Sequence, residues 1–173
     1  PKDFDIVHVE WITPNNQETS LEYVKRLSSQ IDSSKPFILI GLSFGGMLVS
    51  ELLTFLRPEK AIIISSFKTN RLPWYFKFAK WTGVYKIAPY GLFKSPNRLS
   101  YWLFGVKTDQ EKDLLKQILK ETDKQFLKWA VRQILKWPNT IPNKNIVHIH
   151  GTNDKLIPIK YVKPDHVVKD GGH

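Results

Sequence analysis

Residues 41–46 read Gly-Leu-Ser-Phe-Gly-Gly, and the segments on either side of them predict the fold. The preceding run, Pro36-Phe37-Ile38-Leu39-Ile40, has the length and composition of a buried strand. The following run, residues 47–53, has the composition of a helix. A G-x-S-x-G pattern between a strand and a helix is typical of a nucleophile elbow. In this sharp turn the hydroxyl of Ser43 is lifted away from the end of the sheet.

The glycines of this motif have an expected steric role. Gly41 and Gly45 are predicted to leave room for the close approach of the strand and the helix. The N-terminus of the helix also leaves backbone N–H groups without helical partners beside Ser43. Such groups can stabilise an oxyanion that forms at the serine.

Two segments near the C-terminus carry the residues that could act with Ser43. An apolar strand ends in the turn of His150-Gly151-Thr152-Asn153-Asp154, and Pro158 follows. The last residues, 165–173, read as a short strand, a Gly-Gly turn and a terminal histidine, His173. A serine, an acid and a histidine in this chain order are the order of the nucleophile-elbow hydrolases.

With these pieces the chain resembles the α/β-hydrolase superfamily, from about residue 5 to residue 173 but only weakly between about 67 and 140. The resemblance implies that Ser43 is the nucleophile, His173 the general base and Asp154 the acid that orients the imidazole. It also implies that the backbone N–H of Phe44 is one oxyanion donor. No cofactor and no metal are expected.

Other histidines and acids compete for these roles. His8, His148, His150 and His166 lie in or beside predicted strands and are interpreted as structural. His148 and His150 share one face of a strand, a spacing that suits a metal, but no third ligand is evident. Asp165 and Asp170 are the rival acids, and Asp170 is only three residues from His173. Asp154 is preferred because it stands at a strand end and precedes Pro158.

The composition fits a single domain of 173 residues without cysteine. A chain without thiols fits a reducing compartment, so a cytoplasmic location is expected. No run approaches the roughly 18 apolar residues of a membrane span.

The formal charge of +10 lies entirely in residues 67–140, which hold 15 Lys and Arg against 5 Asp and Glu. The same segment contains 15 of the 22 aromatic residues. By the resemblance, it is an inserted helical lid on a core formed by residues 1–66 and 141–173. Its rings and lysines suit an amphiphilic or anionic substrate, or contact with a membrane surface. The favoured interpretation is that the rings form the core of the lid itself and the lysines its solvated face. No nucleic-acid motif accompanies the charge, so a nucleic-acid partner is not expected.

Hydrophobic periodicity predicts the remaining elements as an alternation of strands and helices. Strands are expected at 4–9 and 61–65, and a helix follows the capping box of Thr19 and Glu22. A helix ending near Leu56 is expected after the elbow. Two more helices are predicted with caps at 108–111 and 122–125. The fold class is therefore α/β, with a mainly parallel sheet covered by helices on both faces.

The chain also departs from the superfamily pattern. The usual sheet begins with further strands before the one expected at 4–9, and a loop among them supplies the second oxyanion N–H. Neither is recognised, so the N-terminal strands of the fold and the second donor are predicted to be absent from this chain. Residues 1–173 are interpreted as the central part of a longer hydrolase.

The expected function is cleavage of a carboxylic ester through an acyl-enzyme. A serine in the elbow argues against the related enzymes that use an aspartate nucleophile. A thioesterase or an acyltransferase is an alternative within the same chemistry. A non-catalytic ligand-binding protein with a hydrolase fold is the alternative from another class. The oligomeric state is open.

Overall fold

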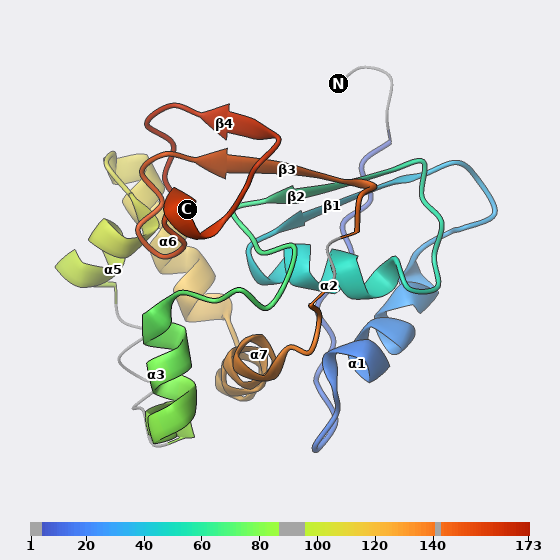
Figure 1. Ribbon diagram of the computed structural model, residues 1–173, viewed down its shortest axis with the longest axis horizontal. Coiled ribbons are helices and arrows are strands. Elements are labelled where there is room, and N and C mark those ends of the chain that lie inside the picture. Colours follow the sequence, from blue (N-terminus) through green and yellow to red (C-terminus); the bar gives the residue numbers. More distant parts are fainter. Residues whose placement is uncertain (1–4, 87–95, 141–142) are drawn as a thin grey trace.

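A computed structural model describes residues 5–86, 96–140 and 143–173 (Figure 1). The strands of the described residues are β1 (Ile38–Leu42), β2 (Lys60–Ile64), β3 (Ile146–Gly151) and β4 (His166–Val168). The helices of the described residues are α1 (Ser20–Leu27), α2 (Phe44–Leu52), α3 (Trp74–Thr82), α5 (Arg98–Phe104), α6 (Asp109–Glu121) and α7 (Lys124–Lys136). Short 3-10 turns cover Ser28–Gln30, Val84–Lys86 and Ile159–Tyr161.

The four strands form one parallel sheet in the order β1-β2-β3-β4. In its register, Leu42 of β1 lies opposite Ile64 of β2, and Ile64 lies opposite Ile149 of β3. Because the strands are parallel, all their carboxyl ends meet at one edge of the sheet. The loops that leave these ends are therefore brought together, although they are far apart in the sequence.

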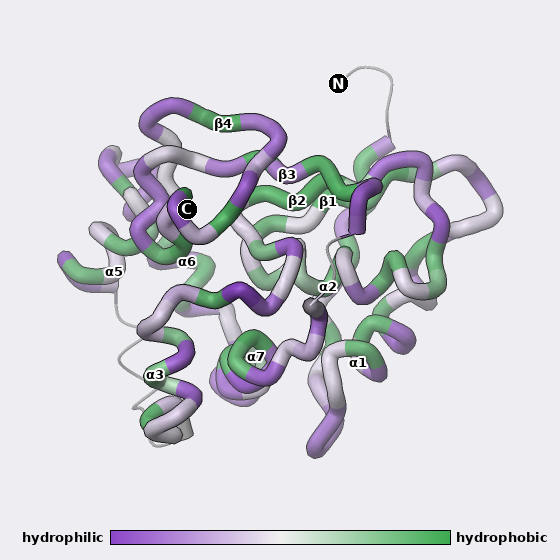
Figure 2. The backbone as a smooth tube through the Cα atoms, in the orientation of Figure 1, coloured by the Kyte–Doolittle hydropathy of each residue, from purple (hydrophilic) through white to green (hydrophobic). Residues whose placement is uncertain are grey.

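Helices α1, α2 and α7 lie on one face of the sheet (Figure 1). Their apolar side chains join those of β1 and β2 in the main core, which includes Tyr23, Leu48, Ile63 and Trp129. Strands β1 to β3 are rich in hydrophobic residues, whereas α7 contains both hydrophobic and hydrophilic residues (Figure 2). On the opposite face of β1, the side chains of Ile40 and Leu42 are exposed.

The predicted strand at residues 4–9 is wrong for the part that is described. Residues 5–9 have no regular secondary structure, and the side chains of Ile6 and Val7 are 69% and 74% exposed. A strand needs a hydrogen-bonding neighbour, and these residues pair with none of the four described strands. The hydrophobic pattern of the sequence does not reveal whether a neighbouring strand is present. Phe4 lies outside the described residues.

The hydroxyl of Tyr23 fixes the chain just beyond this segment. It donates a hydrogen bond to the carbonyl oxygen of Ile12 and accepts one from the N–H of the same residue. The Tyr23 ring packs against Trp129 of α7, with 4.4 Å between the ring centroids. The N-terminal segment is thus attached to the core by side-chain contacts.

The predicted helices are found, with two changes at their ends. The capping boxes of Thr19 with Glu22 and of Thr108 with Glu111 are present. Helix α2 ends at Leu52, four residues before the expected end. The cap of α7 is Asp123, which accepts the N–H of Phe126, whereas Thr122 is the C-cap of α6. The carboxylate competes well for this position because it also complements the helix dipole.

Helix α7 is tied to the core by polar contacts as well as by its rings. The indole N–H of Trp129 donates to the carbonyl oxygen of Glu18 at 2.8 Å. The indole N–H of Trp137, which follows the helix, donates to the carboxylate of Glu51 at 2.6 Å. This part of the basic, aromatic segment therefore packs directly on α1 and α2.

The structure changes the interpretation of the elbow glycines. A Cβ on Gly41 would meet the backbone carbonyl of Gly45, and one on Gly46 would come within 2.5 Å of the Ser66 hydroxyl oxygen. A Cβ on Gly45 would meet only the ring of Trp11, at 4.0 Å. The close strand–helix contact therefore requires Gly41 and Gly46, and Gly45 has room for a methyl group.

A matched pair of substitutions tests this contact. We expect Gly41→Ala to lower the free energy of unfolding by more than about 2 kcal/mol, because the added methyl group meets backbone that cannot move aside. We expect Gly45→Ala to leave it unchanged or raise it by up to about 1 kcal/mol, because alanine favours the helix. Urea unfolding monitored by circular dichroism measures both. Equal losses in the two variants would contradict this account.

Candidate active site

The candidate site lies at the carboxyl edge of the sheet, where three loops bring together residues from distant parts of the sequence. Ser43 follows β1, Asp154 follows β3, and His173 follows β4. The structure places the side chains of these three sequence-predicted residues in contact. Their catalytic roles stay predictions.

Ser43 has a backbone conformation that is unusual for a residue with a side chain. Its φ is 52° and its ψ is −119°. The N–H of Ser43 donates to the carbonyl oxygen of Ile64 at 2.9 Å, and the hydroxyl of Ser66 donates to the carbonyl oxygen of Ser43 at 2.7 Å. Such a conformation costs about 1–3 kcal/mol and persists only where its surroundings enforce it. These two bonds and the packed helix α2 supply that constraint.

A continuous chain of hydrogen bonds links the three side chains. The Nε2 atom of His173 is 2.8 Å from Oγ of Ser43, and its Nδ1 atom is 2.8 Å from Oδ2 of Asp154. The carboxylate can only accept, so Nδ1 carries the proton and Nε2 is free to accept one from the serine. This arrangement can deprotonate Ser43 during an attack on an electrophile.

Asp154 is almost fully buried, and its carboxylate is held on both oxygens. Oδ1 accepts the backbone N–H of Ile157 at 2.6 Å, while Oδ2 faces Nδ1 of His173. Nε2 of His150 lies 3.4 Å from the same Oδ2 and 2.7 Å from the carbonyl oxygen of Ile157. His150 therefore contacts both the carboxylate of Asp154 and the loop that carries it. Sequence reasoning did not identify this role.

Helix α5 fixes the other side of His173. The backbone N–H of His173 donates to the carbonyl oxygen of Phe104, the last residue of α5, at 3.1 Å. The two rings meet edge to face, with 5.5 Å between centroids. Gly172 allows this approach, since a Cβ there would come within 2.7 Å of the Phe104 carbonyl oxygen. No local sequence signal identifies Phe104.

The rival acids make other contacts. Asp165 accepts hydrogen bonds from the Lys68 ammonium and from the backbone N–H of His148, which together hold the pKa of its carboxyl below the usual range. Asp170 accepts a bond from the side chain of Asn153, 3.4 Å away. The carboxylate that contacts His173 is that of Asp154, which favours the assignment of Asp154.

The remaining histidines divide into two exposed and two buried residues. His8 and His166 are exposed, whereas His148 and His150 are 1% and 0% exposed. Nε2 of His148 lies 3.2 Å from Nδ1 of His150, so two of the ring nitrogens face each other. Within the described residues no group of three or more His, Cys, Asp or Glu residues has a geometry suited to a metal.

The direction of the hydrogen bonds leaves one buried atom of His148 without a partner. The Ile157 carbonyl can only accept, so His150 donates from Nε2 and accepts at Nδ1 from His148. Nδ1 of His148 then remains unpaired. Burial, with the nearby His150 and Lys68, lowers the pKa of His148 to about 4, and Asp165 opposes this shift only in part.

The position of Phe44 fits the expected oxyanion donor. It is the first residue of α2, where backbone N–H groups have no partner within the helix. Its role as a donor, and the predicted absence of a second donor from this chain, stay predictions.

Comparisons with known proteins identify the fold. No protein-family profile and no curated sequence matches the chain. It is similar to the structure of a thermophilic esterase, with a TM-score of 0.55 and 14% identity, covering 92% of this chain and 67% of the esterase. It is also similar to an α/β-hydrolase family protein from Desulfitobacterium hafniense, with a TM-score of 0.54 and 10% identity, over 89% and 68% of the two chains. A third similar structure is an α/β-hydrolase enzyme from a Medee basin deep-sea metagenome library, with a TM-score of 0.50 and 17% identity, over 92% and 67%.

The chain therefore has the fold of the α/β-hydrolase superfamily, as the resemblance implied. It matches about two thirds of the length of these structures. Among its described helices, none has the length and apolar character needed to cross a bilayer.

The buried His148 predicts a loss of stability in mild acid. Its folded pKa, about 4, lies below the ordinary value of 6.5, so the unfolded state binds more protons between these two values. Stability is thus fully present above about pH 6.5 and falls as the pH drops toward 4. We expect the urea midpoint to decrease between about pH 7.5 and about pH 5.

The matched variant is His148→Gln, which keeps an N–H donor for His150 but does not titrate. Its urea midpoint should change less over the same range, since the remaining titratable groups are the same. An identical pH dependence in parent and variant would show that His148 is not the source.

Proposed function

We propose that this protein is a serine hydrolase that cleaves a carboxylic ester through an acyl-enzyme. The observation that carries the proposal is the hydrogen-bonded chain from Ser43 Oγ through His173 to Asp154, with two distances of 2.8 Å. The structural neighbours that are described as an esterase and α/β-hydrolases support the same class of activity.

In the proposed acylation step, Oγ of Ser43 attacks the carbonyl carbon of the ester while Nε2 of His173 accepts the hydroxyl proton. Asp154 holds the ring and stabilises the imidazolium. The negative charge that develops on the carbonyl oxygen faces the N-terminus of α2, where the N–H of Phe44 can donate to it. The bond to the leaving oxygen then breaks, and His173 returns the proton to the leaving alcohol.

Deacylation repeats these roles with water. His173 accepts a proton from the water while the water oxygen attacks the acyl carbon. The bond between the acyl carbon and Ser43 Oγ then breaks. The proton returns to Ser43 and restores the starting state. A thiol leaving group would make the protein a thioesterase, and an alcohol in place of water would make it an acyltransferase.

We also propose that residues 67–140 act as a lid on the core formed by residues 1–66 and 141–173. Two contacts support the proposal. The hydroxyl of Tyr75 in α3 donates to the carbonyl oxygen of Leu156 at 2.7 Å, in the loop of Asp154, and burial raises the pKa of Tyr75 to about 12. Phe104 of α5 contacts His173.

Contact of this lid with an anionic membrane surface is a further prediction. On α3 the rings of Trp74, Phe78 and Trp81 are exposed, with Lys77 and Lys80 exposed between them. Aromatic and basic residues in this arrangement suit a lipid headgroup region. We expect the protein to sediment with vesicles that contain anionic lipid, and Trp81→Ala to sediment less. Equal binding to neutral vesicles would contradict the role of charge.

A small fluorophosphonate probe tests the activated nucleophile. We expect one adduct by intact mass on the parent chain and none on Ser43→Ala, because the probe reacts with a serine that has a base beside it. Asp154→Asn should label at least about a hundredfold more slowly, because the amide favours the wrong tautomer of His173.

The matched control is Asp170→Asn, which removes a carboxylate three residues from His173 but leaves Asp154 in place. It should label at nearly the parent rate. If the parent takes up no adduct although it is folded, the protein is a ligand-binding member of the fold and the proposal is wrong. If Asp170→Asn is as slow as Asp154→Asn, the assignment of the acid is wrong.

A further inference from the structure

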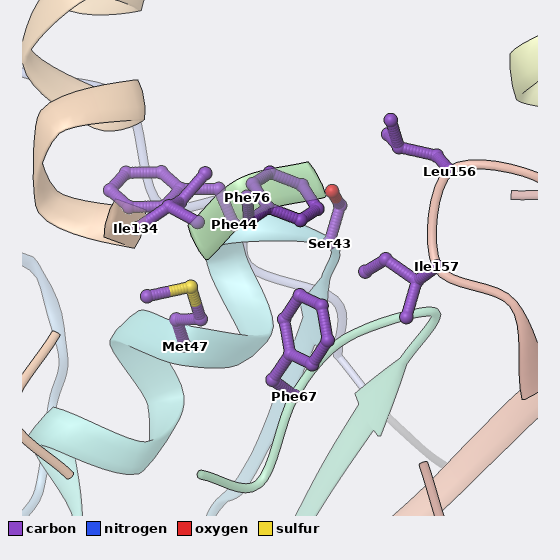
Figure 3. Close-up of a pocket in the computed structure, with 8 residues that line it drawn as sticks. All are labelled: Ser43, Phe44, Met47, Phe67, Phe76, Ile134, Leu156 and Ile157. Atoms are coloured by element: carbon purple, nitrogen blue, oxygen red, sulfur yellow. The ribbon is translucent and has the colours of Figure 1, made fainter. Parts of the chain in front are cut away.

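A small apolar cavity opens beside Ser43. It measures about 40 Å³ and is lined by Ser43, Phe44, Met47, Phe67, Phe76, Ile134, Leu156 and Ile157. Figure 3 shows the hydroxyl of Ser43 at one side of the space and the side chains of Met47 and Ile134 at the other. Apart from the serine, every lining side chain is a hydrocarbon, a thioether or an aromatic ring.

We propose that this cavity receives the acyl group of the substrate and limits it to a short, uncharged chain of about two to four carbons. The inference rests on the proposed hydrolase function and adds to it the size of the acyl group. A water-sized group needs about 10–15 Å³ of such volume, so the cavity accommodates about three of them beyond the carbonyl carbon.

The far end of the cavity is closed by the buried core. Met47 is four residues beyond Ser43, so its side chain lies on the same face of α2, one turn further in. Met47 and Phe67 are 2% and 4% exposed and pack with Leu72, Trp137 and Ile157 in the second core cluster. A longer acyl chain would have to displace this packed group.

The walls also exclude a charged acyl group. Among the residues that the structure describes, no Lys, Arg, Asp or Glu lines the space, and burying an unpaired charge there would be costly. The basic side chains of residues 67–86 and 96–140, the described part of this segment, are therefore not expected to contact the acyl end of the substrate. An anionic or amphiphilic character, if the substrate has one, belongs to the leaving group.

The loop of Asp154 and the proposed lid both contribute to the cavity. Leu156 and Ile157 follow the acid directly, and the N–H of Ile157 is bound by its carboxylate. Phe76 of α3 and Ile134 of α7 close the remaining sides. The size of the acyl site is thus linked to the position of the acid and the lid.

The test compares kcat/KM for p-nitrophenyl acetate, butyrate, hexanoate and octanoate. Each ester is used below the concentration at which it forms aggregates. We expect the parent to fall by at least about tenfold from butyrate to octanoate, because forcing extra methylenes into a packed site is unfavourable. Without a closed wall the opposite trend is expected, since each buried methylene favours binding by about 0.8 kcal/mol.

Met47→Ala removes the far wall and should move the preferred chain toward hexanoate, with a smaller fall to octanoate. Leu72→Ala truncates the same core cluster away from the cavity and should keep the parental preference. Since either variant could unfold, circular dichroism accompanies each assay, and the parental series stands by itself as a test.

The outcomes separate the two proposals. If the small fluorophosphonate labels Ser43 but the parent prefers octanoate to butyrate, the acyl-site inference is overturned and the hydrolase proposal stands. A shift in Leu72→Ala equal to that in Met47→Ala would also overturn it. If Ser43 takes up no probe and no ester is cleaved, both proposals fail together.

Discussion

The rest of the site depends on the backbone of Ser43, which is held at a φ of 52°. This conformation turns the hydroxyl out of the sheet toward His173 while the chain passes directly from β1 into α2. The neighbouring strand maintains it, because Ile64 accepts the N–H of Ser43 and Ser66 donates to its carbonyl oxygen. The conformational free energy that this positive φ costs is small compared with the stabilisation from packing α2 against β1. Gly41 and Gly46 make this packing possible.

The parallel sheet converts this local geometry into a site. Ser43 and His173 are separated by 130 residues, yet they follow strands that end at the same edge. Asp154 follows β3, one of the two strands that lie between β1 and β4, and its loop also supplies two walls of the cavity. Helices α5 and α3 add further contacts, because the carbonyl oxygen of Phe104 accepts the N–H of His173 and the hydroxyl of Tyr75 donates to Leu156 in the loop of Asp154. The proposed catalytic residues, the proposed acyl site and the proposed lid therefore depend on the same contacts around the loop of Asp154.

Sequence reasoning succeeded where the signal was local and failed where a partner was required. The elbow, four of the five predicted strands and the caps at Thr19 and Thr108 follow from neighbouring residues. The strand expected at 4–9 has the right hydrophobic pattern, but residues 5–9 have no strand to pair with. Gly45 matched the motif although it is Gly46 that faces Ser66. A motif records residue identity, whereas steric need depends on what lies opposite.

By itself the sequence determined the fold class and named Ser43, Asp154 and His173, because the strand–turn–helix pattern and the chain order of the three are readable locally. Only the tertiary structure decided that Asp154 rather than Asp170 contacts the imidazole, since three residues of separation say nothing about direction. Only the tertiary structure showed that Phe104 contacts His173, that Tyr75 contacts the loop of Asp154, and that His150 lies beside the Asp154 carboxylate. It also set the volume beside the serine, because that volume is left by side chains from five segments that meet only when the chain is folded.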